Sequence, residues 1–170
     1  MKIGLLKCDR VDKELRMKFG DHSDFFIDLF QKYTPSVSLD VFDVQQEEYP
    51  KNIDDYRGYI CTGSRFSVYE EEPWIRRLRT FIRELYDNHK AFVGICFGHQ
   101  MIAEALGGKC SLSDSGWAIG VKKASIYKHR SWMLPKLARF NLLVSHRDQI
   151  EILPPEGSIV AGNDHCPHSM

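Results

Sequence analysis

The sequence lacks an excess of charge of either sign. Lys plus Arg and Asp plus Glu both number 23 in 170 residues, so the formal net charge is zero. A protein that binds nucleic acid through a broad cationic face would carry an excess of basic residues. No apolar run approaches the roughly 20 residues that a membrane-spanning helix needs. We therefore expect neither a nucleic-acid partner nor a membrane partner.

Paired cysteines are also lacking. The five cysteines are odd in number, lie far apart and include no CxxC pair: Cys8, Cys61, Cys96, Cys110 and Cys166. This spacing argues against a disulfide scaffold and favours reduced thiols. The first seven residues are too short and too soon interrupted by charge for a signal peptide, and they read as a strand. We therefore expect a cytoplasmic protein.

Internal repeats, low-complexity tracts and linkers are absent from the sequence as well. A length of 170 residues allows one domain with a sizeable core and leaves little room for a second. The hydrophobic fraction of 43% is ordinary for a globular protein. We predict a single domain over residues 1–170.

Short apolar runs alternate with helical patterns through the first two thirds of the chain. The expected strands are Lys2–Cys8, Ser38–Val44, Tyr59–Cys61 and Ala91–Ile95. Three helices are expected. The first follows Asp21, which can cap it, and ends at Thr34-Pro35; the second begins at Pro73, and the third runs from Gly98 to Leu106. The charged, aperiodic segment Asp9–Gly20 is expected to be a loop. This alternation predicts an α/β fold with a doubly wound, flavodoxin-like, mainly parallel sheet and helices on both faces.

The character of the chain changes after Lys109. Strand-like segments follow at Val121–Tyr127, Asn141–Ser145 and Ser158–Ala161, with turns and Pro154-Pro155 between them. We expect a more β-rich C-terminal half, in which Ser158–Ala161 has no later strand to pair with.

Cys96 has the sequence context of a nucleophile. It follows the buried Ala91–Ile95 run and opens a helix, which is where G-x-S-x-G hydrolases place their serine on a tight turn. Gly94 and Gly98 allow a sharp turn and close packing. A helix N-terminus beneath the sulfur favours the reactive thiolate, and neighbouring N–H groups can hold an oxyanion. The other four cysteines lack this context, and we interpret them as small apolar core residues.

The segment Gly94-Ile95-Cys96-Phe97-Gly98-His99-Gln100 resembles the G-x-C-x-G-x-Q nucleophile motif of class I glutamine amidotransferases. The resemblance continues through 103–108, 116–121, 145–149 and 166–168. Thr62-Gly63-Ser64 and the segment 67–74 resemble the branch that contains free-standing, GMP-synthase-like amidotransferases and γ-glutamyl peptidases.

The resemblance implies an enzyme that hydrolyses a glutamine or γ-glutamyl amide through a thioester on the catalytic Cys96. It implies oxyanion donors at the N–H groups of Gly63 and Phe97, and substrate-binding residues at Gln100, Ser145 and His146. It implies no cofactor. Ammonia would pass to a synthetase partner, or the domain would hydrolyse γ-glutamyl bonds unaided.

Activation of the cysteine is where the sequence departs from the family pattern. The family uses a His-x-Glu pair beyond the Cys-Pro-His motif, and the 170 residues reach only Met170. We expect the natural protein to continue for several tens of residues. His99 is one helical turn from Cys96 but has little freedom to reach the sulfur, and His146 matches the substrate-binding segment.

Two other functions remain open at this point. A degenerate amidotransferase fold would serve as a non-catalytic module that binds a small molecule or a partner. The other possible function is that of a redox or stress protein of the wider flavodoxin-like group, in which an elbow cysteine oxidises reversibly. Proteins of that group tend to place a histidine where this sequence has Phe97. The crowded spacing of His165, Cys166 and His168 matches no usual zinc pattern, so we expect no metal.

Overall fold

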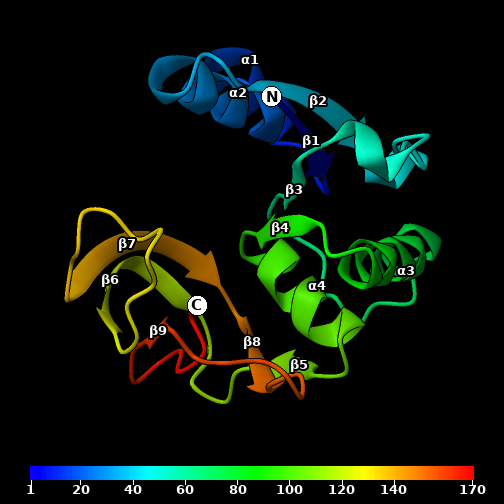
Figure 1. Cartoon of the computed structure of the whole chain (residues 1–170). Helices are drawn as coiled ribbons and strands as arrows, with labels where there is room; N and C mark the ends of the chain where they lie inside the picture. The colour runs from blue at the N-terminus through cyan, green and yellow to red at the C-terminus, as the bar shows by residue number, and fades with distance from the viewer. The chain divides into compact units, whose positions relative to one another are not determined.

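A computed structural model describes residues 1–170 as two compact units, Met1–Ala105 and Leu106–Met170 (Figure 1). The first carries the parallel sheet and all four α-helices, and the second consists of antiparallel strands and turns.

The first unit is built on four parallel strands in the order β2-β1-β3-β4. They are β1 (Lys2–Lys7), β2 (Ser38–Asp43), β3 (Gly58–Cys61) and β4 (Ala91–Gly94). The chain runs from β1 outward to β2 and then returns to place β3 on the other side of β1. The order of strands therefore reverses between β1 and β3, which is the point where doubly wound sheets bind their ligands. The predicted α/β fold is confirmed.

Helices flank this sheet. They are α1 (Lys13–Phe19), α2 (His22–Tyr33), α3 (Pro73–Asp87) and α4 (Phe97–Ala105), with short 3-10 turns η1 (Val44–Gln46) and η2 (Ile53–Asp55). Helix α2 packs on β1 and β2, whereas α4 packs on β3, β4 and α3. Asp21 caps α2 in a full capping box with Asp24, as the sequence predicts.

The segment Asp9–Gly20, predicted to be a loop, contains helix α1, so that prediction was wrong. Asp12 caps the helix by accepting the N–H of Glu14, and the N–H of Gly20 closes its last turn on Arg16. None of its residues is buried. Because the helix buries no apolar face, the sequence carries no hydrophobic period that would reveal it.

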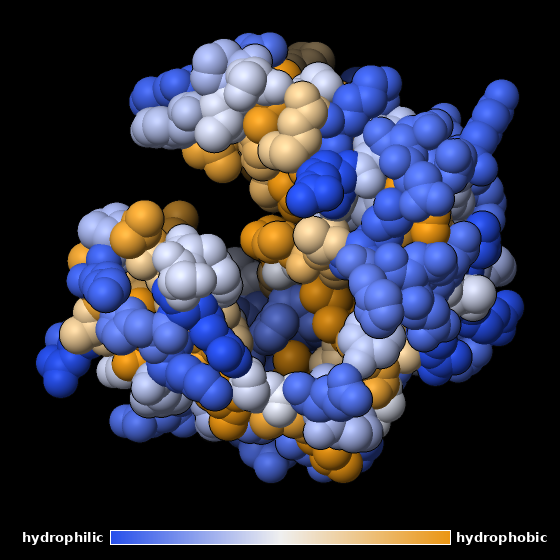
Figure 2. Space-filling model, viewed as in Figure 1, coloured by the Kyte–Doolittle hydropathy of each residue, from blue (hydrophilic) through white to orange (hydrophobic).

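Helix α3 supplies much of the core of the first unit. Pro73 stands in its first turn, and one face is buried: Trp74, Ile75, Leu78, Phe81, Ile82 and Leu85. Phe81 meets the ring of Tyr59 edge-on at 5.8 Å between centroids, which fastens the helix to β3. The outer face of α3 is hydrophilic (Figure 2). The predicted amphipathic helix is confirmed.

The second unit confirms the β-rich C-terminal half. Strand β5 (Lys109–Leu112) pairs antiparallel with β8 (Asp148–Ile152), and β6 (Ala118–Ile126) lies between β7 (Arg139–His146) and β9 (Ala161–Gly162). The predicted strand Ser158–Ala161 is wrong in extent, since pairing begins only at Ala161. Its partner is an earlier strand, because β9 pairs with Ser125 and Ile126 of β6.

None of the helices combines the length and the apolar character that crossing a membrane requires.

Candidate active site

Cys96 occupies a strained turn between β4 and α4. Its φ angle is +51°, in the left-handed region that L-residues other than Asn, Asp and His rarely adopt. Strand β4 ends at Gly94 and α4 begins at Phe97, so the whole change of direction falls on two residues. The cysteine is exposed. Strain of this kind is concentrated at functional sites, where surrounding structure maintains it.

Both glycines of the elbow are sterically required. A Cβ atom on Gly94 would collide with the backbone of Gly98 and His99, because β4 and α4 are in direct contact there. A Cβ atom on Gly98 would lie 2.7 Å from the carbonyl oxygen of Cys61 and 3.0 Å from its sulfur. The G-x-C-x-G pattern therefore reflects close packing of α4 on β3 and β4 as well as the turn itself.

Gly63, a predicted oxyanion donor, lies beside Cys96. A Cβ atom built on Gly63 would stand 3.6 Å from the Cβ of Cys96. The two loops are joined by a hydrogen bond from the N–H of Ile95 to the carbonyl of Cys61, at 3.0 Å. The segment after β3 and the elbow after β4 are therefore neighbours at the carboxyl edge of the sheet.

Phe97 and Gln100 complete the predicted residues of the first unit. Phe97 is the first residue of α4, where N–H groups have no intrahelical acceptor. Its buried ring packs on Trp74, with 5.6 Å between the ring centroids. The N–H of Gln100 donates to the carbonyl of Cys96 at 3.0 Å, and its side chain is buried. The roles of Gly63, Phe97 and Gln100 toward a substrate stay predictions.

Ser145 and His146 lie in the second unit, at the end of β7. Successive residues of a strand point to opposite faces, so the two side chains diverge. Ser145 is exposed, whereas Nδ1 of His146 lies 3.3 Å from the carbonyl of Asp148 and its ring meets His165 edge-on. Their role in holding the substrate stays a prediction.

Two hydrogen bonds through Thr62 connect Cys8, just after β1, to the carbonyl of Gly63. The N–H of Cys8 donates to the hydroxyl of Thr62 at 2.9 Å, and that hydroxyl donates to the carbonyl of Gly63 at 3.0 Å. The sulfurs of Cys8 and Cys61 are in contact at 3.2 Å, and all three side chains are buried. Burial, reinforced by the hydrogen bond to Cys61, raises the pKa of the Cys8 thiol.

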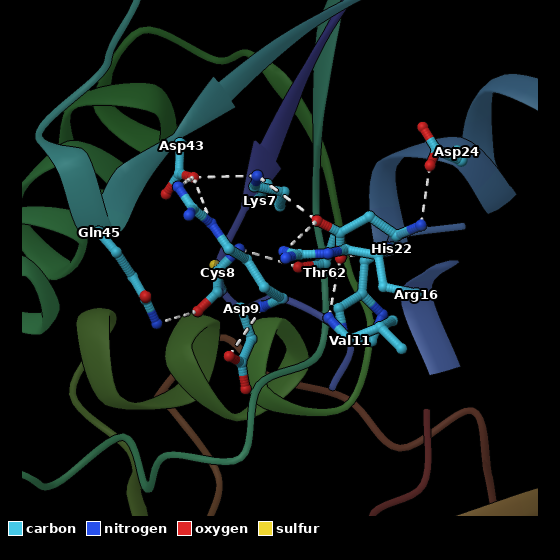
Figure 3. A network of polar contacts seen from close by, with 12 residues as sticks. Lys7, Cys8, Asp9, Val11, Arg16, His22, Asp24, Asp43, Gln45 and Thr62 are labelled. Carbon is cyan, nitrogen blue, oxygen red and sulfur yellow. Dashed lines mark hydrogen bonds and ion pairs between the residues drawn. The ribbon is translucent and has the colours of Figure 1, made fainter. Parts of the chain in front are cut away.

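Charged residues gather at the carboxyl ends of β1 and β2 (Figure 3). Nζ of Lys7 lies 2.9 Å from Asp43 and 3.8 Å from Asp21, and the guanidinium of Arg10 also binds Asp43. Burial raises the pKa of Asp43, but hydrogen bonds from Arg10 and Lys7 outweigh it and the net shift is downward. For Asp21 burial is outweighed by the N–H groups of Val11 and His22, so its pKa is also lowered.

A second ion pair joins Asp9 to Arg65, which follows Gly63 by two residues. Oδ2 of Asp9, just after β1, accepts both the backbone N–H of Arg65 at 2.8 Å and its Nε at 2.9 Å. Asp9 is buried, whereas the side chain of Arg65 is 64% exposed. Hydrogen bonding and the charge of Asp9 raise the pKa of Arg65, which is therefore a permanent cation.

The model of the family described as glutamine amidotransferase class-I matches residues 29–169 of this sequence, a range that includes the whole elbow. The chain belongs to the class I glutamine amidotransferase family. The predicted family is confirmed.

Proteins similar to this amidotransferase chain include γ-glutamyl peptidase 4 of Arabidopsis thaliana, 29% identical over 160 residues. The match covers 88% of this chain and 62% of the peptidase, so the chain spans about three fifths of that relative's length. The GMP synthase [glutamine-hydrolyzing] of Caldanaerobacter subterraneus is 28% identical over 130 residues, covering 74% of this chain and 23% of the synthase. A glutamine amidotransferase from Thermotoga maritima shares the fold, with a TM-score of 0.79 at 21% identity over 98% of this chain and 69% of that one.

Two polar residues of these loops have no role that the sequence alone indicates: Asp9, and Thr62, which the sequence marks only as part of the segment Thr62-Gly63-Ser64. Thr62 and Asp9 are single polar residues after apolar strands, and the sequence does not reveal that they are buried or what they bind. A polar residue directly after a buried parallel strand is nevertheless a usable signal, because strand ends meet at one edge of the sheet. Applied to β1 and β3, that signal would have pointed to Asp9 and Thr62.

Proposed function

We propose that this chain cleaves the side-chain amide of glutamine or of a γ-glutamyl compound, with Cys96 as the nucleophile. The observation that carries the proposal is the left-handed backbone of an exposed Cys96 between β4 and α4. A strained, exposed nucleophile at a strand-to-helix turn is the geometry that acyl-transfer enzymes of this kind share. Membership in the class I amidotransferase family supports it.

The first chemical step forms a thioester. The thiolate of Cys96 attacks the amide carbon, a C–S bond forms, and the carbonyl electron pair moves onto oxygen. The N–H groups of Gly63 and Phe97 are proposed to stabilise that oxyanion, since one lies against Cys96 and the other opens α4. Collapse of the intermediate breaks the C–N bond, and the departing amine takes a proton.

The second step returns the enzyme to its starting state. Water adds to the thioester carbon, the C–S bond breaks, and the γ-glutamyl group leaves as a carboxylate while Cys96 regains its proton. A base must take the thiol proton in the first step and a proton of the attacking water in the second, and the family pattern assigns that task to a His-x-Glu pair beyond Cys166-Pro167-His168. Gln100 is proposed to contact the glutamyl portion from the first turn of α4.

The names of the relatives support both kinds of substrate. One relative is called a γ-glutamyl peptidase and another a glutamine-hydrolysing GMP synthase. We therefore propose that ammonia or an amine is released from this site. Transfer of the ammonia to a synthetase partner is the variant of this function that the second name supports.

The decisive experiment is site-resolved labelling with a diazo-ketone analogue of glutamine. Peptide mapping should find Cys96 alkylated at least tenfold faster than the other four thiols, of which Cys8, Cys61 and Cys110 are buried and Cys166 half-buried. Glutamine should slow the reaction. Two controls accompany it: the Cys96→Ser variant with the glutamine analogue, and the wild type with a diazo-ketone that lacks the amino-acid group. Neither should show rapid labelling at position 96.

Two results would contradict the proposal. Equal labelling of all five cysteines would mean that Cys96 has no special reactivity. Slow labelling combined with stabilisation of the fold by glutamine would identify a module that binds its ligand without cleaving it.

A further inference from the structure

Arg65 belongs to the loop after β3 that contacts the elbow at Gly63, and it has no part in the proposed chemistry. It follows Gly63 by two residues, and two residues span at most about 7 Å. Since Gly63 lies against Cys96, the backbone of Arg65 is within the length of a small substrate from the sulfur. It also lies at the carboxyl ends of β1 and β3, where the strand order reverses.

The guanidinium of Arg65 is fixed in direction. Nε donates to Asp9, and one terminal nitrogen donates to the carbonyl of Arg10 at 2.7 Å. The same Asp9 oxygen holds the backbone N–H of Arg65, and Oδ1 of Asp9 holds the N–H of Arg10. A flexible surface arginine loses several rotatable bonds on binding a ligand, whereas this one is already held.

The held guanidinium still has binding capacity. An arginine side chain has five N–H donors in a planar fork, and the two side-chain bonds to Asp9 and Arg10 use two of them. The side chain is 64% exposed although its anchor Asp9 is buried. The fork geometry matches a carboxylate or phosphate better than any neutral group.

We infer that Arg65 binds a carboxylate on the amine side of the scissile bond. The preferred substrate is then a γ-glutamyl amino acid or peptide, whose departing amine carries a carboxylate that free glutamine lacks. Arg65 comes from the segment after β3, whereas Gln100, the residue proposed for the glutamyl portion, comes from α4. This inference rests on the proposed function and adds the group that selects among its substrates.

The test compares two ligands that differ only in that carboxylate. Wild-type protein is alkylated with the diazo-ketone glutamine analogue in the presence of γ-glutamylglycine or of γ-glutamylglycinamide, and the concentration that halves the labelling rate of Cys96 is measured. The acid should protect at about tenfold lower concentration than the amide, as expected for one charge-assisted pair. The ratio should shrink in 1 M salt, because the pair is solvent-exposed.

Variants locate the effect. Arg65→Met should bring the ratio of the two protecting concentrations to about one, and Arg65→Lys should retain part of it because the charge stays and the fork is lost. Arg76→Met is the matched control: Arg76 is also exposed and ion-paired, to Glu71, but it lies on α3. Its ratio should equal that of the wild type.

The outcomes separate this inference from the proposed function. Failure of the diazo-ketone to label Cys96 selectively would overturn the function and the inference together. Selective labelling with equal protection by acid and amide in the wild type would overturn the inference alone, and that comparison needs no variant to fold. If Arg65→Met weakened protection by glutamine as much as by γ-glutamylglycine, Arg65 would serve the glutamyl end instead, which also contradicts the inference.

Discussion

At the scale of single residues, the backbone of Cys96 is held against its own preference. A φ angle of +51° is comfortable for glycine and costs other residues of order 1 kcal/mol or more. The close packing at Gly94 and Gly98 holds α4 against β3 and β4 and so maintains the strained turn. The turn that exposes the sulfur of Cys96 therefore lowers the free energy of unfolding.

This strain predicts an inverted order of stability at position 96. Cys96→Gly should be more stable than Cys96→Ala by about 1 kcal/mol, because glycine adopts the left-handed conformation without strain. In an ordinary helical or extended position alanine would be the more stable of the two. Urea denaturation of both variants measures the difference. A Cys96→Ala protein at least as stable as Cys96→Gly would show that the turn is not strained.

Position 98 should also be more stable as glycine than as alanine, but for a steric reason and not because of its backbone conformation. A Cβ atom there meets backbone as well as the Cys61 sulfur, so Gly98→Ala should destabilise the fold by about 2–3 kcal/mol. It should also slow the labelling of Cys96, since α4 must move away from β3. Thermal unfolding and labelling rates test both. Helix propensity alone would favour alanine by about 1 kcal/mol, so an increase in stability would refute the steric argument.

At the scale of elements, Lys7 links β1 to β2 and to the N-terminus of α2. Its side chain is only 13% exposed and lies between the carboxylates of Asp43 and Asp21. Lys7→Met should therefore cost about 3 kcal/mol at neutral pH, because it leaves two largely buried carboxylates with less compensating charge. Lys2→Met, on the same strand but with an exposed ion pair to Asp40, is the control and should cost less than about 1 kcal/mol.

The cost of Lys7→Met should depend on pH. Folding lowers the pKa of Asp43 and Asp21, so these groups stabilise the fold above their unfolded pKa, near 4, and that contribution is lost as pH falls below it. Without Lys7 both pKa values should rise. Wild type and variant should therefore differ most at pH 6–7 and converge below about pH 3, as measured by denaturation across that range. A constant difference would mean that Lys7 contributes through packing alone.

The elements that the sequence predicted well have apolar residues at the spacing of their own geometry. Strand β1 and helices α3 and α4 were expected close to their observed bounds, and the fold buries their apolar residues. Helix α2 was expected from its cap and its apolar spacing, although none of its residues is fully buried. Helix α1 and strands β5 and β8 were not expected, since α1 buries nothing and the β5 sequence has no clear alternation. The site divides in the same way. The glycines on either side of Cys96 identify it in the sequence. The bonding partners of Thr62 and Asp9 lie in distant segments of the chain, so the sequence does not reveal them.

At the scale of the whole molecule, the two units differ in how much apolar surface they bury. Large buried side chains such as Tyr59, Phe81 and Leu78 belong to the first unit. The buried apolar residues of the second are mostly small: Cys110, Ala118, Ala124, Met133, Ile150, Val160 and Ala161. Its paired strands β6 and β7 leave Ile119, Val121 and Leu143 between 65% and 82% exposed, and apolar atoms reach the surface in that region of Figure 2.

This difference predicts unequal protection of backbone amides. Amides of β1 and β3, which lie at the centre of the parallel sheet, should exchange with solvent at least about 10²-fold more slowly than those of β6 and β7. Hydrogen exchange followed by mass spectrometry resolves the two regions in one experiment. Uniform protection across both sheets would mean that the chain opens only as a single cooperative unit.

The central place of β1 in its sheet has a consequence for how the chain is made. Leu5 and Leu6 of β1 are fully buried, but the partner strands on both sides come later in the chain, and Ile3 pairs with Gly58. At about 5–20 residues per second, roughly three to ten seconds of synthesis separate β1 from β3. Both edges of this apolar strand lack a partner until β2 is made, and the edge that pairs with β3 lacks one throughout that time. Synthesis therefore exposes this protein to aggregation, and chaperones that bind short apolar segments have a target in Lys2–Lys7.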